Sequence, residues 1–238
     1  MSKMLSEYDY QSFTTEPDGL HVPAGFNVAA LPSMMEPAEQ PTCCTPTESD
    51  TELLVMVQDR RIRVLSPYWH VGWENAKQGA YVRSGIADRL SAVCDGLPHG
   101  FGLAVFDAWR PLSLQQEIYD AAYADPTLPQ GFVSLPSTDP TVPPPHLTGA
   151  AVDVTLTWEN TPLELGSPFD DFTENALADS YERTPGRVRG LRRLLYWSMR
   201  QQGFIVIQCE WWHFELGTRR WAALTGQPVQ YGAAHLPE

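Results

Sequence analysis

A run of twenty residues, 126–145, contains seven prolines. Proline lacks a backbone N–H and disrupts helices, so this run is neither a helix nor a central strand. We expect a long, rigid surface loop, and loops of this length in compact domains often carry function. The loop leads into PPPHLTGAAVDVTL at 143–156, which presents one histidine, turns at a glycine and enters a strand with one aspartate. His146 and Asp153 are therefore natural candidates for a site.

Hydrophobic patterning on both sides of this loop predicts an α+β fold. Strands are expected at 51–57, 60–65, 103–106, 152–157 and 204–209. Helices are expected at 80–97, 113–124 and 187–202, the second with Ser113 as its N-cap and the third ended by Gly203. This mixture favours one domain in which helices pack against a mostly antiparallel sheet.

The first fifty residues differ from the rest of the chain. They hold six prolines, scattered acidic residues and little periodicity. We expect an irregular N-terminal arm over 1–50 and a catalytic domain over 51–238.

Composition narrows the possible partners and compartment. A net charge of −13 makes nucleic acid and anionic membrane surfaces unlikely partners, because both need a cationic face. No segment has the roughly 18 apolar residues of a membrane span, and the first residues lack the apolar core of a secretion signal. We therefore expect a cytoplasmic protein.

The four cysteines of the chain lack CxxC spacing and are expected to be reduced, although the adjacent pair Cys43–Cys44 leaves a redox or metal role open.

The segment EWWHFEL at 210–216 adds a second group of functional candidates. Glu210 and His213 are three residues apart beside a buried strand. Residues at that spacing face opposite sides of a regular strand, so their joint use requires a bulge or a turn. Trp211 and Trp212 are expected in the core or the pocket wall.

Two histidines and one aspartate, His146, Asp153 and His213, match the three protein ligands of a catalytic zinc, with a fourth position left for water. Glu210 would stand beside that water as general base. Arg110, at the end of a buried strand, is the candidate for stabilising an oxyanion, although it could simply pair with Asp107.

Three segments carry a family resemblance: FDAWRP at 106–111, HLTGAAVD at 146–153 and EWWHF at 210–214. In this order they resemble the D-alanyl-D-alanine dipeptidases of the vancomycin-resistance type, zinc metallopeptidases of the hedgehog/D-Ala-D-Ala peptidase fold. The resemblance covers about residues 50–220. It implies one zinc ion held by His146, Asp153 and His213, with Glu210 as the base and Arg110 at the transition state.

The same resemblance implies residues that contact a small dipeptide. Asp170 matches the aspartate that holds the substrate's ammonium group, a contact that limits the substrate to two residues. His70 falls at the position of a family tyrosine, with Tyr68 nearby, and Pro144 replaces a family serine. Because both departures concern substrate contacts, the implied substrate is D-alanyl-D-alanine or a related D-residue dipeptide.

Several alternatives stay open. The same chemistry could act on another small peptide or amide. Two histidines and a carboxylate also describe the facial triad of non-haem iron oxygenases, although those set the first two ligands closer together. A non-catalytic peptide-binding member would be expected to lack Glu210 or a ligand. A peptidoglycan carboxypeptidase would need export and a more open groove, which Asp170 argues against.

Overall fold

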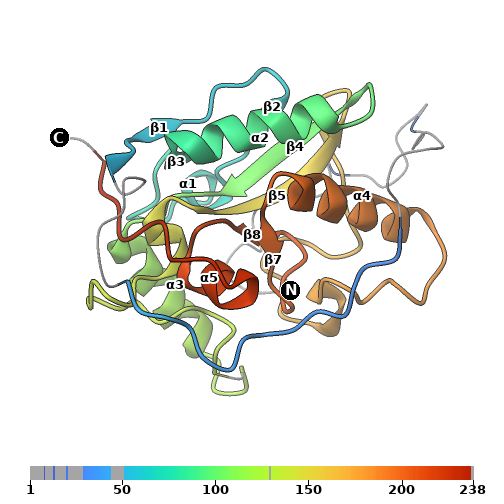
Figure 1. Ribbon diagram of the computed structural model, residues 1–238. Helices are drawn as coiled ribbons and strands as arrows, with labels where there is room; N and C mark the ends of the chain where they lie inside the picture. The colour runs from blue at the N-terminus through green and yellow to red at the C-terminus, as the bar shows by residue number, and fades with distance from the viewer. Residues whose placement is uncertain are drawn as a thin grey trace.

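A mixed sheet forms the centre of the molecule, whose computed structural model describes residues 8, 13, 20, 29–43, 51–128 and 130–236 (Figure 1). The strands are β1 (Leu54–Met56), β2 (Ile62–Val64), β3 (Tyr81–Arg83), β4 (Phe101–Asp107), β5 (Ala151–Trp158), β6 (Thr161–Pro162), β7 (Ile205–Val206) and β8 (His213–Glu215). The helices are α1 (Pro67–His70), α2 (Ser84–Gly96), α3 (Leu112–Tyr123), α4 (Arg187–Gln201) and α5 (Arg219–Thr225), with short 3₁₀ helices η4 (Pro145–Thr148) and η5 (Glu174–Ala176).

The strand order of the main sheet is β2-β4-β5-β8-β7, and β6 pairs with β5. Only β2 and β4 are parallel among these pairs. Strands β1 and β3 form a separate antiparallel pair. The predicted α+β domain with a mostly antiparallel sheet is confirmed.

The register of three adjacent strands brings polar residues into one row across the sheet. Asp153 on β5 pairs with His213 on β8 and with Asp107 on β4. A register shift between Val105 and Asp107 adds one residue to β4, so that Asp107 comes opposite Asp153. Because directly opposed residues share a face, this row places three functional side chains together.

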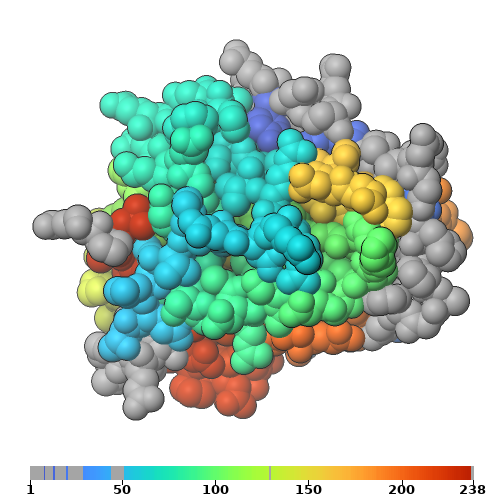
Figure 2. All heavy atoms as spheres, turned by 90° about the horizontal axis from the view of Figure 1, so that it is seen from above, coloured from blue at the N-terminus to red at the C-terminus, as the bar shows by residue number. Residues whose placement is uncertain are grey.

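Two helices, α2 and α4, cover one face of the sheet (Figure 1). Helix α2 packs on β4, α4 packs on β5 and β7, and the two helices contact each other. Their apolar faces bury Ile86, Leu90, Leu191 and Leu194 almost completely. Seen from above, residues in the colour range of about 51–100 lie over the centre and upper left of the molecule (Figure 2). The sheet is thus a buried platform, as the near-complete burial of β4 and β5 requires.

Some predicted boundaries are wrong. The segment 81–83 is strand β3 rather than the first turn of a helix, because its backbone pairs with β1. Helix α3 begins at Leu112 with Pro111 as its N-cap, so Ser113 lies inside the first turn. Helix α4 ends as predicted, with Gly203 just beyond it at a φ of 92°. Helix α5 was not predicted.

The described part of the N-terminal region, 29–43, runs across the surface without a helix or strand. It is fixed at several points: Ala29 O accepts a hydrogen bond from Trp197, Pro41 O accepts one from Arg219, and the Cys43 N–H donates to Thr141 O. Most of the predicted arm over 1–50, and Cys44, lie outside the described residues. Within those residues, Cys94 and Cys209 are free thiols, and no helix is long and apolar enough to cross a membrane.

Candidate metal centre

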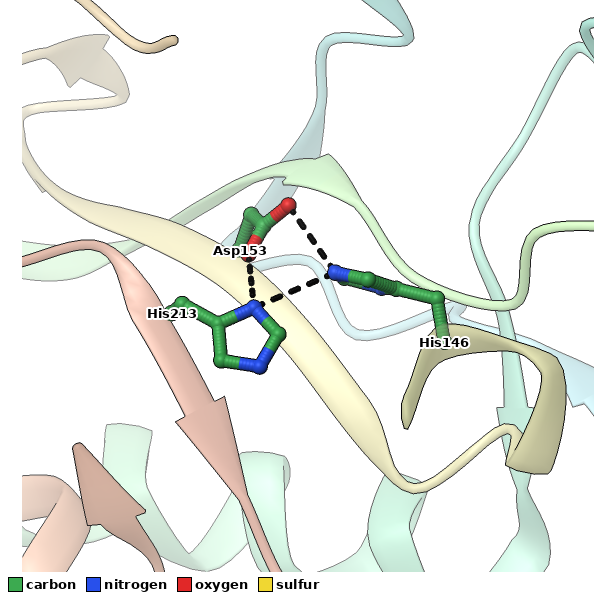
Figure 3. Close-up of side chains that lie close together, drawn as sticks. All are labelled: His146, Asp153 and His213. Atoms are coloured by element: carbon green, nitrogen blue, oxygen red, sulfur yellow. Dashed lines mark hydrogen bonds and ion pairs between the residues drawn. The ribbon is translucent and has the colours of Figure 1, made fainter. Parts of the chain in front are cut away.

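Three side chains converge at the row of paired strands (Figure 3). Asp153 Oδ1 lies 2.9 Å from His213 Nδ1, and Asp153 Oδ2 lies 3.2 Å from His146 Nε2. The two imidazole nitrogens are 3.2 Å apart. All three residues are buried, and their potential ligand atoms lie within 4.8 Å of one another. The predicted ligands therefore meet, although seven and sixty residues separate Asp153 from His146 and His213.

His146 is positioned by the end of the proline-rich segment. Pro145 starts the 3₁₀ helix η4, and Gly149 ends it in the left-handed conformation at a φ of 71°. A side chain at Gly149 would overlap the side chain of Leu54. The glycine thus allows the chain to reverse from the histidine directly into β5.

The second nitrogen of each imidazole ring faces a separate acceptor. His146 Nδ1 lies 2.7 Å from the carbonyl oxygen of Ala108, and His213 Nε2 lies 3.1 Å from Glu215 Oε1. A carbonyl and a carboxylate can only accept, so each ring donates there and keeps its other nitrogen free as a metal ligand. Two such nitrogens and one carboxylate in a buried group fit a zinc ion with three protein ligands.

The charges of this group perturb one another. Burial alone would raise the pKa of Asp153, but the two histidines hold it below its usual range. Burial alone would lower the pKa of His213, but hydrogen bonds to Asp153 and Glu215 raise it to about 10. The buried acids thus favour positive charge on the His213 ring, and a metal ion bound there would replace the proton on Nδ1.

Glu210 lies in the turn between β7 and β8, where the His213 N–H donates to Glu210 O at 3.4 Å. The turn required by the spacing in EWWH is thus present. Glu210 Oε2 lies 3.8 Å from His213 Nδ1, on the side of the ring that faces the other ligands. Burial raises the pKa of the Glu210 carboxyl to about 8, which suits a group that exchanges protons near neutral pH.

Arg110 is almost fully buried beside the ligands. Its Nε donates to Asp107 Oδ2 at 2.7 Å, and Nη1 donates to Gln115 Oε1 at 2.9 Å. Nη2 lies 3.8 Å from Asp153 Oδ2. The pairing with Asp107 and a role in the site are compatible, because two of its three nitrogens fix the guanidinium while the third faces the ligand group.

Asp170 lines the same cavity from the segment after β6, in a left-handed conformation with a φ of 58°. Tyr68 Oη donates to Asp170 Oδ2 at 2.5 Å. Burial raises the pKa of Asp170 to about 7, although Tyr68 and Arg110 oppose this shift. The structure does not bring His70 into the group: its side chain is exposed at the end of α1, and Tyr68 lines the cavity instead.

The cavity that these residues line is narrow, about 50 Å³. It adjoins a wider cleft of about 420 Å³ between the proline-rich segment, α3 and α5. Both are bordered by Gly131, Val133, Ser134 and Arg220. Pro144 lines the wider cleft only. The site thus consists of a small inner cavity next to the candidate metal ligands and a larger outer cleft.

The sequence motifs do not point to Gln115 or Glu215, and they place Tyr68 only near the site. Gln115 links Arg110 to the proline-rich segment, because its amide also donates to Ser134 O at 2.7 Å. A buried polar residue in an amphipathic helix gives a weak signal: Gln115 precedes the apolar position Ile118 by three residues. Glu215 belongs to the quoted EWWHFEL segment, but its partner Arg220 lies in the helix that was not predicted.

Two histidines, one aspartate and an adjacent glutamate at a buried cavity define a site of the metallopeptidase class. A family model described as D-ala-D-ala dipeptidase, Peptidase_M15, matches residues 87–229, which include all of these side chains. This match covers more than half of the chain, and the chain therefore belongs to the M15 family of D-Ala-D-Ala dipeptidases. It is a peptidase of the metal-dependent type.

Individual relatives agree with this family. A D-alanyl-D-alanine dipeptidase of Synechocystis sp. is 27% identical over 221 residues, covering 77% of this chain and 89% of that protein. A D-alanyl-D-alanine dipeptidase of Escherichia coli K12 is 36% identical over 118 residues, or 49% of this chain and 56% of that protein. A crystal structure of the vancomycin resistance D,D-dipeptidase VanXYg, in complex with a D-Ala-D-Ala phosphinate analogue, aligns with 82% of this chain and 67% of that chain at 17% identity and a TM-score of 0.42.

Proposed function

We propose that this protein is a zinc-dependent dipeptidase that hydrolyses D-alanyl-D-alanine or a closely related D-residue dipeptide. The observation that carries the proposal is the meeting of His146, Asp153 and His213 with Glu210 at one buried cavity. The names of the two curated relatives support the substrate. A cytoplasmic location remains a prediction, consistent with the free thiols of Cys94 and Cys209.

His146, Asp153 and His213 would hold the zinc ion. When bound, zinc polarises a carbonyl oxygen and lowers the pKa of water, which is the chemistry that peptide hydrolysis needs. Glu210 would accept a proton from the attacking water and deliver it to the leaving amine. Its raised pKa allows it to act in both directions near neutral pH.

Arg110 would face the carbonyl oxygen on which negative charge develops. Its guanidinium is held by Asp107 and Gln115, so it does not need to reorganise during the reaction. A donor fixed in this way in a buried site stabilises developing charge more effectively than water does.

Asp170 would bind the ammonium group of the substrate and so measure the distance from the N-terminus to the scissile bond. We propose Tyr68, rather than His70, as its neighbour in substrate binding, because Tyr68 donates to Asp170 and lines the cavity. Pro144 borders the outer cleft, which suggests that its replacement of the family serine affects the C-terminal end of the substrate.

The test is turnover of a dipeptide panel by zinc-loaded protein, detected by ninhydrin. The panel holds D-Ala-D-Ala, L-Ala-D-Ala, D-Ala-L-Ala, L-Ala-L-Ala and D-Ala-Gly. Each is run with the wild type, with Glu210→Gln and with Glu164→Gln, which changes an exposed glutamate.

We expect D-Ala-D-Ala to be cleaved and Glu210→Gln to lower kcat by about 10²–10⁴-fold, the usual contribution of a general base. Glu164→Gln should match the wild type. Cleavage of another panel member alone would keep the mechanism and replace the substrate. Full activity of Glu210→Gln would rule out the proposed base.

A further inference from the structure

The ring of His213 is held from behind by a buried carboxylate, whereas His146 is held by a neutral backbone carbonyl. Glu215 has no exposed surface. Its Oε1 accepts from His213 Nε2 at 3.1 Å, and its Oε2 accepts from the hydroxyl of Thr218. Burying a carboxylate costs free energy unless each oxygen has a partner, so the complete burial of Glu215 beside His213 points to a role in the site.

Arg220 on α5 supplies the opposite charge. Its Nη1 donates to Glu215 Oε1 at 2.5 Å, the same oxygen that faces His213. Its Nε lies 3.2 Å from Glu36 Oε2, an ion pair without hydrogen-bond geometry. The three side chains form a line of alternating charge that leads from the protein surface to the metal ligand.

Glu36 belongs to the segment 29–43, outside the region that the family model matches. Its second oxygen, Oε1, accepts from the Gln208 N–H at 2.9 Å. Gln208 lies in the same turn as Glu210. A single surface carboxylate thus contacts both the end of the charged line and the turn that carries the proposed base.

We propose that Glu36, Arg220 and Glu215 form a positioning chain that orients His213 and strengthens its hold on the metal. This inference rests on the proposed zinc site. An imidazole that donates its far N–H to a carboxylate keeps the near nitrogen free as a ligand and gains basicity. Arg220 permits the carboxylate to be buried, and Glu36 limits how far Arg220 draws charge away from Glu215.

Zinc affinity is the measurement that separates this role from a merely structural one. We would determine the zinc dissociation constant of the full chain by competition with a chromogenic chelator, and the unfolding free energy of the metal-free protein by urea titration. The variants are Glu215→Gln, which keeps an acceptor but removes the charge, and Glu36→Gln. The matched control is Glu39→Gln, which removes an exposed charge from the same segment.

Glu215→Gln is expected to weaken zinc binding by about 10–100-fold, the usual effect of removing an outer carboxylate from a ligating histidine. Glu36→Gln should weaken it by a smaller factor, and Glu39→Gln should leave it unchanged. In zinc-saturated enzyme, Glu215→Gln should lower kcat more than it alters KM.

Unchanged zinc affinity in Glu215→Gln, with only a lower unfolding free energy, would overturn the proposal. If Glu215→Gln does not fold, Glu36→Gln provides the test, because Glu36 lies at the surface. Equal zinc affinities of Glu36→Gln and Glu39→Gln would also overturn the proposal. Failure of the wild type to bind zinc would instead refute the proposed function.

Discussion

The metal side and the substrate side of the cavity are built in different ways. Asp153 and His213 lie opposite each other on paired strands, so backbone hydrogen bonds of the sheet set their separation. Asp170 and Tyr68 come from a loop and a single helical turn, and they are joined to each other by one side-chain hydrogen bond. We therefore expect metal binding to depend mainly on strand register and substrate recognition to depend on a few side-chain contacts.

The sharpest test of this division is Asp170→Asn, which keeps the size of the side chain and removes its charge. A hydrogen bond to a charged group contributes about 1.5–3 kcal/mol, so KM for D-Ala-D-Ala should rise by about 10–150-fold. Zinc affinity should stay at the wild-type value. Steady-state kinetics and chelator competition measure both, with Glu174→Gln, an exposed change in the same segment, as the control. Loss of zinc from Asp170→Asn would show that the two sides are not separable.

A second test uses pH. Burial raises the pKa of Asp170 to about 7 in the folded protein, above the 3.8 of an ordinary aspartate. Protonated Asp170 cannot pair with an ammonium group, so KM should rise as pH falls below 7, approaching about tenfold per pH unit. Asp170→Asn should remove this dependence.

The same shift affects the stability of the metal-free protein. Between pH 4 and 7 the folded state holds a proton on Asp170 that the unfolded state has lost. The stabilising contribution is therefore present at low pH and is lost as pH rises through 7. Urea unfolding across this range should show that the unfolding free energy of the wild type falls relative to that of Asp170→Asn as pH rises. A constant difference would contradict the assignment.

The smallest expected effect concerns Arg192 on α4, which holds the loop that carries Asp170. The buried guanidinium donates to the carbonyl oxygens of Leu165, Leu177 and Asn175 at 2.6–2.7 Å. Lysine cannot serve three acceptors in this planar arrangement. Arg192→Lys should cost about 1–3 kcal/mol of unfolding free energy and raise KM several-fold, with zinc affinity unchanged.

Arg193→Lys is the matched control for this change, because the neighbouring arginine pairs with Glu182 nearer the surface. This pair is half-buried, and lysine keeps its charge and one of its two hydrogen bonds, so the control should change stability by about 1 kcal/mol or less. Equal effects of the two substitutions would remove the special role of Arg192.

The meeting of the three candidate metal ligands could be predicted from sequence, because their residue types and local spacing are those that metal binding requires. A histidine before a glycine turn and an aspartate in the following strand indicate a metal site even when the fold is unknown. The base could be predicted on the condition of a turn at 210–213, and the structure contains that turn.

The residues that line the cavity beside Asp170 were harder to predict, as the positions of Tyr68 and His70 illustrate. Both lie on the one-turn helix α1, which is too short to show a helical pattern of apolar residues in the sequence. Residues two apart on a helix point about 200° away from each other, so an alignment that is shifted by two positions selects the opposite side. Glu215 was missed for a related reason: its role depends on Arg220, and α5 is too short to produce a clear hydrophobic pattern.

The extra residue in β4 between Val105 and Asp107 has a consequence for how this chain can change over generations. Substitutions along β4 that preserve bulk leave the row of Asp107, Asp153 and His213 aligned. Loss of a single residue there would move Asp107 out of line with Asp153. We therefore expect the apolar residues of this strand to differ among related chains, whereas the number of residues in the strand should stay the same.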